Sequence, residues 1–488
     1  MIKKIYIALL FAVSIVLIIN KTEVNAEEFI VDSSSTSEAW SKAKWTNYPN
    51  SPKCTPCTPQ TALKNAKAGD TVYFRGGEGG NYDISPHSYI TPKWNPSNSG
   101  TADAPITFKA YPGEAPVLKN SKIECSEGSE RCSGVIIGSR NKDYIIWDGF
   151  QLGKTKDKNI EGNPVVYFSH CTGCALKNTE IHIVNNYDDI YTSNYAGLQL
   201  GHVNNIVIQN NYISGGTHMG EKEGRSFSAA MLFYLVQNST IEFNTIYETA
   251  NGISDKSTGR NNIYRNNFLY HPGARGIWFG GAQGEGSSAR GNKAYNNIIV
   301  SNNQYCKLLH IDDDSSGDGH GEDFQIYNNV FYAQDKASVG IHASDCTNDH
   351  YWNNIFYGTY TTNIWRGEGP NGHPTYMDYN CYYSSDNFTV HKYHDNVAHY
   401  RSLGDWLNSN ELVNGSSPDT HSLVVNPQFI SPGDDPDGFK LQSSSKCLKN
   451  GKNGLNIGAY PNQEQNIQIG CDLFNHELLT APSNLRIE

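Results

Sequence analysis

Short runs of alternating apolar and polar residues recur through the middle of the chain, and each run leads into asparagine. Examples are IVIQNNYIS at Ile206–Ser214, NNIYRNNFLY at Asn261–Tyr270 and FQIYNNVFY at Phe324–Tyr332. Two or three apolar or aromatic residues then follow the asparagine. A period of two is that of a β-strand, and no segment of this region sustains the 3.6-residue period of a helix. The pattern therefore predicts many short strands.

These runs repeat at a regular spacing. The last asparagine of each strong copy falls at Asn211, Asn244, Asn267, Asn297, Asn329 and Asn354, with weaker copies at Asn178 and Asn380. The strong copies are 23 to 33 residues apart, a period typical of solenoids, propellers and arrays. Asparagine tolerates the left-handed conformation of a tight bend, and stacked copies can hydrogen-bond to one another. A propeller blade would need about four strands per 40 residues with a Trp-Asp or Gly-rich mark, which the chain lacks; a sandwich is the other alternative.

The repeat resembles that of right-handed parallel β-helix proteins over roughly residues 106–383. The resemblance implies an all-β solenoid with an N-terminal cap and an irregular C-terminal closing region. The expected divisions are a signal peptide at 1–26, a cap with a first strand at 27–100, coils at 101–383, a closing region at 384–480 and a linker-like tail at 481–488. A short helix is expected at Ala62–Ala68, just before the strand in GDTVYFRGG.

The first 26 residues have the pattern of a secretory signal. Two lysines precede the apolar run Ile5–Ile19, and small residues end at Ala26. The alternative is an uncleaved membrane anchor, although this run is short for a full span. We expect a secreted or cell-surface monomer with no membrane span after signal removal. Eleven cysteines in an exported chain favour disulfides, although two C-x-x-C units leave a zinc or redox site open. The close pairs are Cys54/Cys57, Cys125/Cys132, Cys171/Cys174 and Cys447/Cys471.

Charge is unevenly distributed along the chain. The formal net charge is −11 at pH 7, which argues against nucleic acid or an anionic membrane as a partner. Between Asp255 and Lys293, however, six basic residues stand against two acidic ones, Asp255 and Glu285. The basic residues are Lys256, Arg260, Arg265, Arg275, Arg290 and Lys293. Such a patch suits an extracellular polysaccharide that carries uronates.

This stretch resembles the chondroitinase B and alginate lyase family, in which a Lys-Ser pair precedes an Asn-rich turn and an Arg follows one coil later. Lys256-Ser257 precedes Asn261-Asn262 and matches the first element. Phe279-Gly280-Gly281 stands where the family has Arg-His-Gly, so Arg275 is displaced from the family position. The acidic pair that holds calcium in the family is also missing, because Thr249 and Asn251 occupy that spacing.

The resemblance implies β-elimination on a uronate-containing glycan. In such a lyase the uronate carboxylate must be neutralised before a base removes the C5 proton. A lysine can serve as this base when neighbouring positive charge or burial lowers its pKa. The predicted catalytic residues are Lys256 as base and Arg275 as carboxylate partner; the predicted substrate-binding residues are Arg260, Arg290, Trp278 and His310. A non-catalytic glycan-binding protein or adhesin is the alternative.

An acidic loop follows one coil later. Its residues Asp312, Asp314, Ser316, Gly317, Asp318 and Asp323 match the spacing of a calcium loop at positions 1, 3, 5, 6, 7 and 12. A bound Ca²⁺ is one prediction, and a plain solvated acidic loop is the other. The same aspartates allow a third function, a polygalacturonase-like hydrolase that uses Asp side chains as general acid and base.

Overall fold

The computed structural model describes most of the repeat region and parts of both flanks. The described residues are 26–32, 57–76, 81–83, 92–120, 135–154, 164–183, 196–215, 229–280, 289–303, 306–312, 321–334, 339–343, 346–358, 364–366, 376–384, 390–392, 398–400, 402–408, 419–462 and 467. The tail and all of the predicted signal peptide except Ala26 lie outside them. No helix in these ranges is long and apolar enough to cross a membrane.

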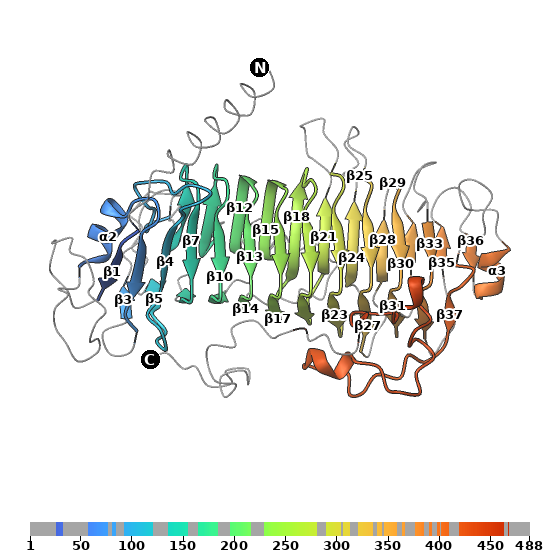
Figure 1. Cartoon of the computed structure of the whole chain (residues 1–488). Coiled ribbons are helices and arrows are strands. Elements are labelled where there is room, and N and C mark those ends of the chain that lie inside the picture. Colours follow the sequence, from blue (N-terminus) through green and yellow to red (C-terminus); the bar gives the residue numbers. More distant parts are fainter. Residues whose placement is uncertain are drawn as a thin grey trace, which may run out of the picture.

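Three long sheets run the length of the molecule, and each coil contributes one strand to each sheet (Figure 1). Sheet A consists of β1 (Glu28–Val31), β2 (Thr71–Phe74), β4 (Ile106–Ala110), β7 (Ile145–Asp148), β10 (Ala175–Lys177), β13 (Val207–Gln209), β16 (Thr240–Glu242), β19 (Ile263–Arg265), β22 (Lys293–Tyr295), β26 (Gln325–Tyr327), β30 (His350–Trp352) and β33 (Tyr376–Asp378). Sheet B consists of β3 (Asn81–Asp83), β5 (Val117–Asn120), β8 (Gln151–Lys154), β11 (Glu180–Ile183), β14 (Tyr212–Gly215), β17 (Thr245–Tyr247), β20 (Phe268–Tyr270), β23 (Ile298–Ser301), β27 (Val330–Ala333), β31 (Ile355–Tyr357), β34 (Cys381–Tyr383) and β37 (Leu423–Val424). Sheet C consists of β6 (Ile137–Arg140), β9 (Val166–Ser169), β12 (Ala196–Asn204), β15 (Ala229–Gln237), β18 (Asn251–Ser257), β21 (Arg275–Gly280), β24 (Lys307–Asp312), β28 (Val339–Ala343), β32 (Ile364–Arg366), β35 (Val390–Lys392) and β36 (Ala398–Tyr400).

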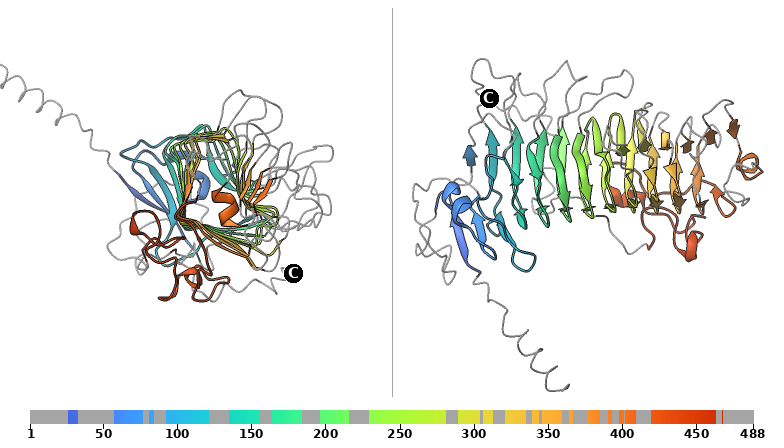
Figure 2. Two further views of the ribbon diagram at one scale, coloured as in Figure 1. Left: turned by 90° about the vertical axis from the view of Figure 1, so that its right-hand side faces the viewer. Right: turned by 90° about the horizontal axis from the view of Figure 1, so that it is seen from above.

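Neighbouring strands within these sheets are parallel, apart from the antiparallel pair β35 and β36. A small parallel pair, β25 (Gly321–Glu322) and β29 (Cys346–Thr347), lies beside them. Viewed along the axis, the three sheets enclose a common interior (Figure 2). Alternate side chains of every sheet fill that interior, and stacked rings such as Phe331 and Phe356 continue it from coil to coil with centroids 5.1 Å apart. The predicted parallel β-helix is confirmed.

The asparagines that marked the repeat form a ladder at the corner between sheets A and B. The side-chain oxygen of each accepts hydrogen bonds from the backbone N–H and the side-chain amide of the asparagine one coil earlier, as for Asn267 and Asn297 at 3.0 Å each. The same pairing connects Asn211, Asn244, Asn267, Asn297, Asn329, Asn354 and Asn380. All seven side chains are fully buried or nearly so. Because each amide is satisfied inside the wall, the ladder can be buried without leaving unpaired polar groups.

The weaker copy assigned to Asn178 is one residue too early. Asn178 occupies the left-handed position of the corner, with a φ of 49°, and Thr179 takes the inward position of the ladder. The backbone N–H of Thr179 donates to the Asn211 side-chain oxygen at 3.0 Å. Threonine lacks the amide that continues the ladder, so the chain of side-chain amide bonds begins at Asn211.

A helix and an additional strand precede the second strand of sheet A. The predicted helix occurs at α2 (Pro59–Asn65), three residues earlier than expected, because the Thr58 hydroxyl caps it by accepting from the backbone N–H of Thr61. Glu28–Val31 is already a strand, in parallel register with Thr71–Phe74. Sheet A therefore starts before the strand that the sequence suggested as the first.

The C-terminal segment folds back along the outer face of sheet B, beneath β23, β27 and β31 in Figure 1. It contains η3 (Pro436–Phe439) and η4 (Lys452–Gly454). Phe429, Phe439 and Tyr460 of this segment pack with outward-facing side chains of sheet B in a second apolar cluster. The segment thereby covers the part of this face formed by β20, β23, β27 and β31, whereas the outward side chains of β8, β11 and β14 have intermediate exposure.

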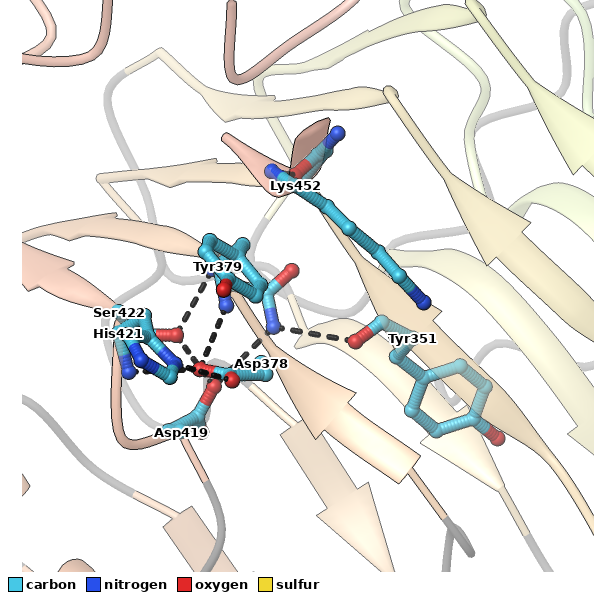
Figure 3. A network of polar contacts seen from close by, with 9 residues as sticks. Tyr351, Asp378, Tyr379, Asp419, His421, Ser422 and Lys452 are labelled. Atoms are coloured by element: carbon cyan, nitrogen blue, oxygen red, sulfur yellow. Dashed lines mark hydrogen bonds and ion pairs between the residues drawn. The ribbon is translucent and has the colours of Figure 1, made fainter. Parts of the chain in front are cut away.

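A polar network ends the Asn ladder (Figure 3). The fully buried Asp419 accepts hydrogen bonds from Ser422, Asn380, Tyr382 and Trp406 at 2.6 to 3.1 Å. Trp406 comes from the short helix α3 (Leu403–Leu407). The backbone N–H of Asn380 donates to the Ser422 hydroxyl at 2.8 Å. Asp419 and Ser422 thus accept the hydrogen bonds of Asn380 that the next asparagine would accept elsewhere in the ladder.

Six cysteines are buried free thiols, namely Cys57, Cys171, Cys174, Cys306, Cys381 and Cys447. Cys171 and Cys174, one of the predicted pairs, are among them and are not joined to each other. Cys54, Cys125, Cys132 and Cys471 of the other predicted pairs lie outside the described residues.

Candidate functional site

A row of side chains on the outer face of sheet C forms the strongest candidate site. Parallel register aligns Ser254, Trp278, His310 and His342 on four successive strands, β18, β21, β24 and β28. The residues on either side of each, such as Ile277 and Phe279 around Trp278, point into the core. Since strand residues alternate between faces, the row faces away from the interior.

Arg275 and Lys307 lie opposite each other beside this row. The Arg275 Nε donates to His310 Nδ1 at 3.0 Å, and Lys307 Nζ is 3.3 Å from His310 Nε2. The Arg275 guanidinium carbon lies 4.4 Å from the centre of the Trp278 ring, in a cation–π contact. We call Arg275, Trp278, Lys307, His310 and His342 the cationic cluster.

Two histidines in the cationic cluster are held neutral. His310 is 1% exposed, and burial, followed by Lys307, His342 and Arg275, holds its pKa well below the usual value. The His342 ring stands edge-on to His310 with centroids 4.6 Å apart. Burial, with Lys307 and Arg275, lowers the pKa of His342 to about 2. Arg275 therefore carries the permanent positive charge of the site, and the two imidazoles are available as neutral hydrogen-bonding groups.

The contacts of His310 constrain the protonation of its neighbour. A neutral imidazole has one donor nitrogen and one acceptor nitrogen. Because Nδ1 accepts from Arg275, Nε2 carries the proton and is directed at Lys307 Nζ. Lys307 can accept that proton only as a neutral amine, which is the form of lysine that can act as a base.

Two buried donors point to a ligand at the same place. The Ser254 hydroxyl and the Trp278 Nε1 are buried and have no hydrogen-bond partner among the described residues. Ser254 is 1% exposed and Trp278 is 8% exposed. Buried polar groups are nearly always paired, so a ligand with several acceptor oxygens would satisfy both.

Lys256, the predicted base, is at the other end of the same strands. It is the extra residue of a β-bulge, because the register of β15 with β18 shifts between Phe233 and Tyr234. A side chain on Gly280 would lie 3.0 Å from the Lys256 carbonyl oxygen. Arg275 pairs with Asn251, five residues before Lys256, so the two backbones are roughly 16 Å apart along the strand. The Arg275 guanidinium reaches part of the way by leaning over Trp278.

Arg260 and Arg290 are not in the cationic cluster. Both lie at the corner between sheets C and A, where Gln237, Arg260, Arg290 and Glu322 pair on successive coils. Arg290 Nη1 is 3.8 Å from a carboxylate oxygen of Glu322, with more than half of its side chain exposed. This is a surface ion pair of small energetic value. Of the six predicted catalytic and substrate-binding residues, the structure brings together Arg275, Trp278 and His310.

The proposed calcium loop falls mainly outside the described residues, which exclude Asp314, Ser316 and Asp318. Asp312 ends β24 opposite Gly280. Asp323 is exposed and has a φ of 59°, and its carboxylate accepts from the Asn348 amide on the next coil. Asp323 thus occupies a corner position. No group of three metal-ligating side chains occurs among the described residues, and calcium binding stays a prediction.

Sequence reasoning missed Lys307 and His342. Lys307 and His310 are three residues apart on one strand, and the chain around them shows no motif. His342 is 32 residues further on, a spacing equal to one coil. An alignment of the coils by their inward apolar residues would have placed His342 beside His310, but the loops between strands vary in length and hide that register.

Comparisons with known proteins give fold likenesses only. Neither a protein-family model nor a curated protein matches the sequence. A GH136 lacto-N-biosidase from Eubacterium ramulus is similar with a TM-score of 0.47 and 10% sequence identity. The match covers 74% of this chain and 64% of that enzyme. A PL6-family polysaccharide lyase from Pseudopedobacter saltans is similar with a TM-score of 0.41 and 15% sequence identity, and the match covers 75% of this chain and 91% of the lyase. A rhamnogalacturonan lyase is similar with a TM-score of 0.40 and 13% sequence identity, and the match covers 86% of this chain and 95% of that lyase. Likenesses this remote carry no argument about activity.

Proposed function

We propose that this protein is a polysaccharide lyase that cleaves a uronate-containing glycan by β-elimination on the outer face of sheet C. The observation that carries the proposal is the hydrogen-bonded series Arg275, His310 and Lys307. It puts a permanent cation and a lysine on the same imidazole, and that lysine can serve as the base once it has lost its proton. These are the two groups that the reaction needs.

The reaction assigns a separate role to each group. Arg275 binds the uronate carboxylate, and its fixed positive charge stabilises the charge that develops when the C5 proton leaves. Lys307 Nζ takes that proton, and the C4–O bond then breaks as a double bond forms between C4 and C5. The departing sugar oxygen takes up a proton from water and leaves as a hydroxyl. His310 touches both catalytic groups and acts as a positioning residue. Trp278 holds the Arg275 guanidinium in place by stacking, and its unpartnered N–H is available to a sugar hydroxyl.

Lys256 stays the alternative base. The Arg275 guanidinium lies over Trp278, and Trp278 is two residues, roughly 7 Å of strand, before Gly280. Because Gly280 has no side chain and faces the Lys256 backbone, the flexible lysine stem can extend along the face of the sheet toward the same sugar. The two lysines therefore require separate variants.

The test measures the ultraviolet absorbance of the conjugated unsaturated uronate during incubation with alginate, pectate, chondroitin sulfate and dermatan sulfate. Removing a general base costs typically 10²- to 10⁴-fold in kcat. We expect this loss in Lys307→Ala and a much smaller effect in Lys256→Ala. Lys293→Ala is the matched control, because Lys293 lies on the outer face of sheet A at a similar intermediate exposure.

Three other results would contradict the proposal in different ways. A loss in Lys256→Ala with activity retained in Lys307→Ala would move the base to the predicted position. New reducing ends without the absorbance would indicate the hydrolase alternative. Glycan binding without either product, with weaker binding in Arg275→Ala, would indicate the non-catalytic alternative.

A further inference from the structure

A second constellation lies on the outer face of sheet B, away from the cationic cluster. Parallel register aligns Gln151, Glu180 and Tyr212 in one row, and His182 and Ser214 in the next. Their strands β8, β11 and β14 precede the part of the face that the C-terminal segment buries. Ile181 and Ile213 between them point into the core. The polar side chains therefore face outward from a rigid wall.

Three of these side chains form a hydrogen-bonded series. The Ser214 hydroxyl is 2.9 Å from His182 Nδ1, and His182 Nε2 is 2.5 Å from Glu180 Oε1. The other carboxylate oxygen of Glu180 accepts from Gln151 Nε2 at 3.0 Å. Because a carboxylate can only accept, Nε2 carries the imidazole proton and Nδ1 presents its lone pair to the serine hydroxyl. This is a nucleophile, a base and a group that orients the base, connected in that order.

We infer that Ser214, His182 and Glu180 form an acyl-ester hydrolase site. The exposure of each group fits its role: the Glu180 side chain is 14% exposed and His182 is 36% exposed, and Ser214 is half-buried. The orienting carboxylate is thus shielded while the base and the nucleophile remain accessible. Ser214 is also followed by Gly215, whose φ of 86° turns the chain away directly after the nucleophile.

Tyr212 can supply the group that stabilises the oxyanion. Its ring centroid lies 6.3 Å from that of His182, and its hydroxyl interacts with the Ser214 side chain. Burial, followed by the nearby Tyr247 and Glu180, raises the pKa of Tyr212, so the phenol stays protonated and can donate. A donor at the developing oxyanion is the largest single contribution in acyl transfer.

The reaction balances without a cofactor. Ser214 Oγ bonds to the ester carbonyl carbon as its proton passes to His182 Nδ1. The C–O bond to the alcohol breaks, and the alcohol oxygen takes that proton. Water then attacks the acyl-enzyme, with His182 again accepting the proton, and the free acid leaves as Ser214 regains its hydrogen.

The substrate class follows from the neighbouring side chains. Gln151, Tyr212 and Tyr247, which stacks on Tyr270, lie beside the three site residues, and these polar and aromatic groups suit a hydrophilic ester more than a long acyl chain. The inferred substrate is an O-acetyl ester carried by a sugar. That the sugar belongs to a polysaccharide rests on the proposed function, whereas the acyl-transfer chemistry does not.

The first experiment is covalent labelling of the full chain with a fluorophosphonate, followed by peptide mass spectrometry. We expect the label on Ser214, and its loss in His182→Ala. Ser169, whose hydroxyl lies 2.7 Å from His170 Nδ1, provides a buried comparison, since it is 1% exposed. Ser169 should stay unlabelled, and Ser169→Ala should leave labelling of Ser214 unchanged. Absence of label on Ser214 in the folded protein would overturn the inference.

The second experiment measures hydrolysis of p-nitrophenyl acetate and acetate release from an acetylated oligosaccharide. Ser214→Ala should lower kcat by about 100-fold or more, and Ser214→Cys provides a second variant with a smaller change of shape. Glu180→Gln should lower kcat with little change in KM, because it disturbs the imidazole tautomer and not substrate contacts, and Glu180→Asp should restore part of the activity. Unchanged hydrolysis in Ser214→Ala would also refute the site. Lys307→Ala should keep full esterase activity, so failure of the lyase and failure of the esterase are separate results.

Discussion

Asp255 lies inside the wall of sheet C, next to Ser254 in β18, and offers a sharp test of how burial shifts the pKa of a carboxyl group. Its side chain is 1% exposed. Oδ2 accepts from the Tyr264 hydroxyl at 2.7 Å and from Asn262 Nδ2 at 3.3 Å, and Oδ1 has no partner among the described residues. Burial raises the pKa of Asp255 to about 7, and the two hydrogen bonds offset only part of that rise.

The sign of the pH dependence follows from linkage. In the unfolded chain Asp255 loses its proton near its ordinary pKa of 3.8, while the folded chain keeps the proton up to about pH 7. Between these values the folded state binds more protons, so stability falls as pH rises and is then constant above about pH 7. A difference of about three pKa units corresponds to roughly 4 kcal/mol. Roughly 3 kcal/mol of this falls between about pH 5 and pH 8.

The perturbation is Asp255→Asn, which keeps the shape, leaves an oxygen to accept from Tyr264 and cannot ionise. The free energy of unfolding is measured in urea at the two pH values for both proteins. We expect the stability of the wild type to fall by roughly 3 kcal/mol more than that of the variant across this interval. Asp419, whose pKa burial raises to about 6, acts in the same direction but is present in both proteins and cancels. An equal pH dependence in the two proteins would refute the reasoning.

Three further substitutions test the packing that holds the site. Asn297→Ala removes the oxygen that accepts from the backbone N–H and the side-chain amide of Asn267, and the amide that donates to the Tyr264 carbonyl and to Asn329 Oδ1. The buried groups that lose a partner should cost about 2–6 kcal/mol in urea unfolding. Gly259→Ala should lower the melting temperature, because the new carbon would lie 1.8 Å from the Asp255 carboxylate and overpacking costs about 1–3 kcal/mol. Trp406→Phe removes the N–H that donates to Asp419 and should cost about 1–3 kcal/mol, with a loss that grows as pH rises from 5 to 7 in matched unfolding curves.

A surface asparagine provides the control for the ladder variant. Asn450 is exposed and its amide donates only to the Lys446 carbonyl. Asn450→Ala should change the free energy of unfolding by less than about 0.5 kcal/mol. A comparable loss in Asn297→Ala and Asn450→Ala would contradict the buried-ladder argument.

Much of the fold could be predicted because it depends on local rules repeated in every coil. The period of two predicted the positions of the strands, and the paired asparagines predicted the position of the corner. One residue of each pair adopts a left-handed conformation, and the next forms hydrogen bonds inside the wall. Asn296 and Asn297 show both roles, with a φ of 55° at the first and the ladder bonds at the second. Asn178 was wrongly predicted as an inward residue, because Thr179 takes the inward position and the pattern of paired asparagines does not reveal a threonine there.

The candidate site was only partly predictable. Arg275, Trp278 and His310 stood out as a charge, a large aromatic ring and a histidine within the basic stretch, and the structure does bring them together. Lys307 and His342 became apparent only through strand register, which joins residues one coil apart. The series of Glu180, His182 and Ser214 has the same origin, since 32 residues separate the histidine from the serine that it contacts.

By itself the sequence determined the class of fold, the spacing of the coils and the identity of the inward asparagines. These features follow from short-range periodicity and from the conformational preference of single residues. Only the tertiary structure decided which side chains share a surface. Each loop between strands has its own length, so distance along the chain does not give the register from one coil to the next. Backbone pairing between coils sets that register, and it places Arg275 opposite Lys307, His310 beside His342, and His182 beside Ser214. Apolar packing, in turn, holds the returning C-terminal segment against the outer face of sheet B.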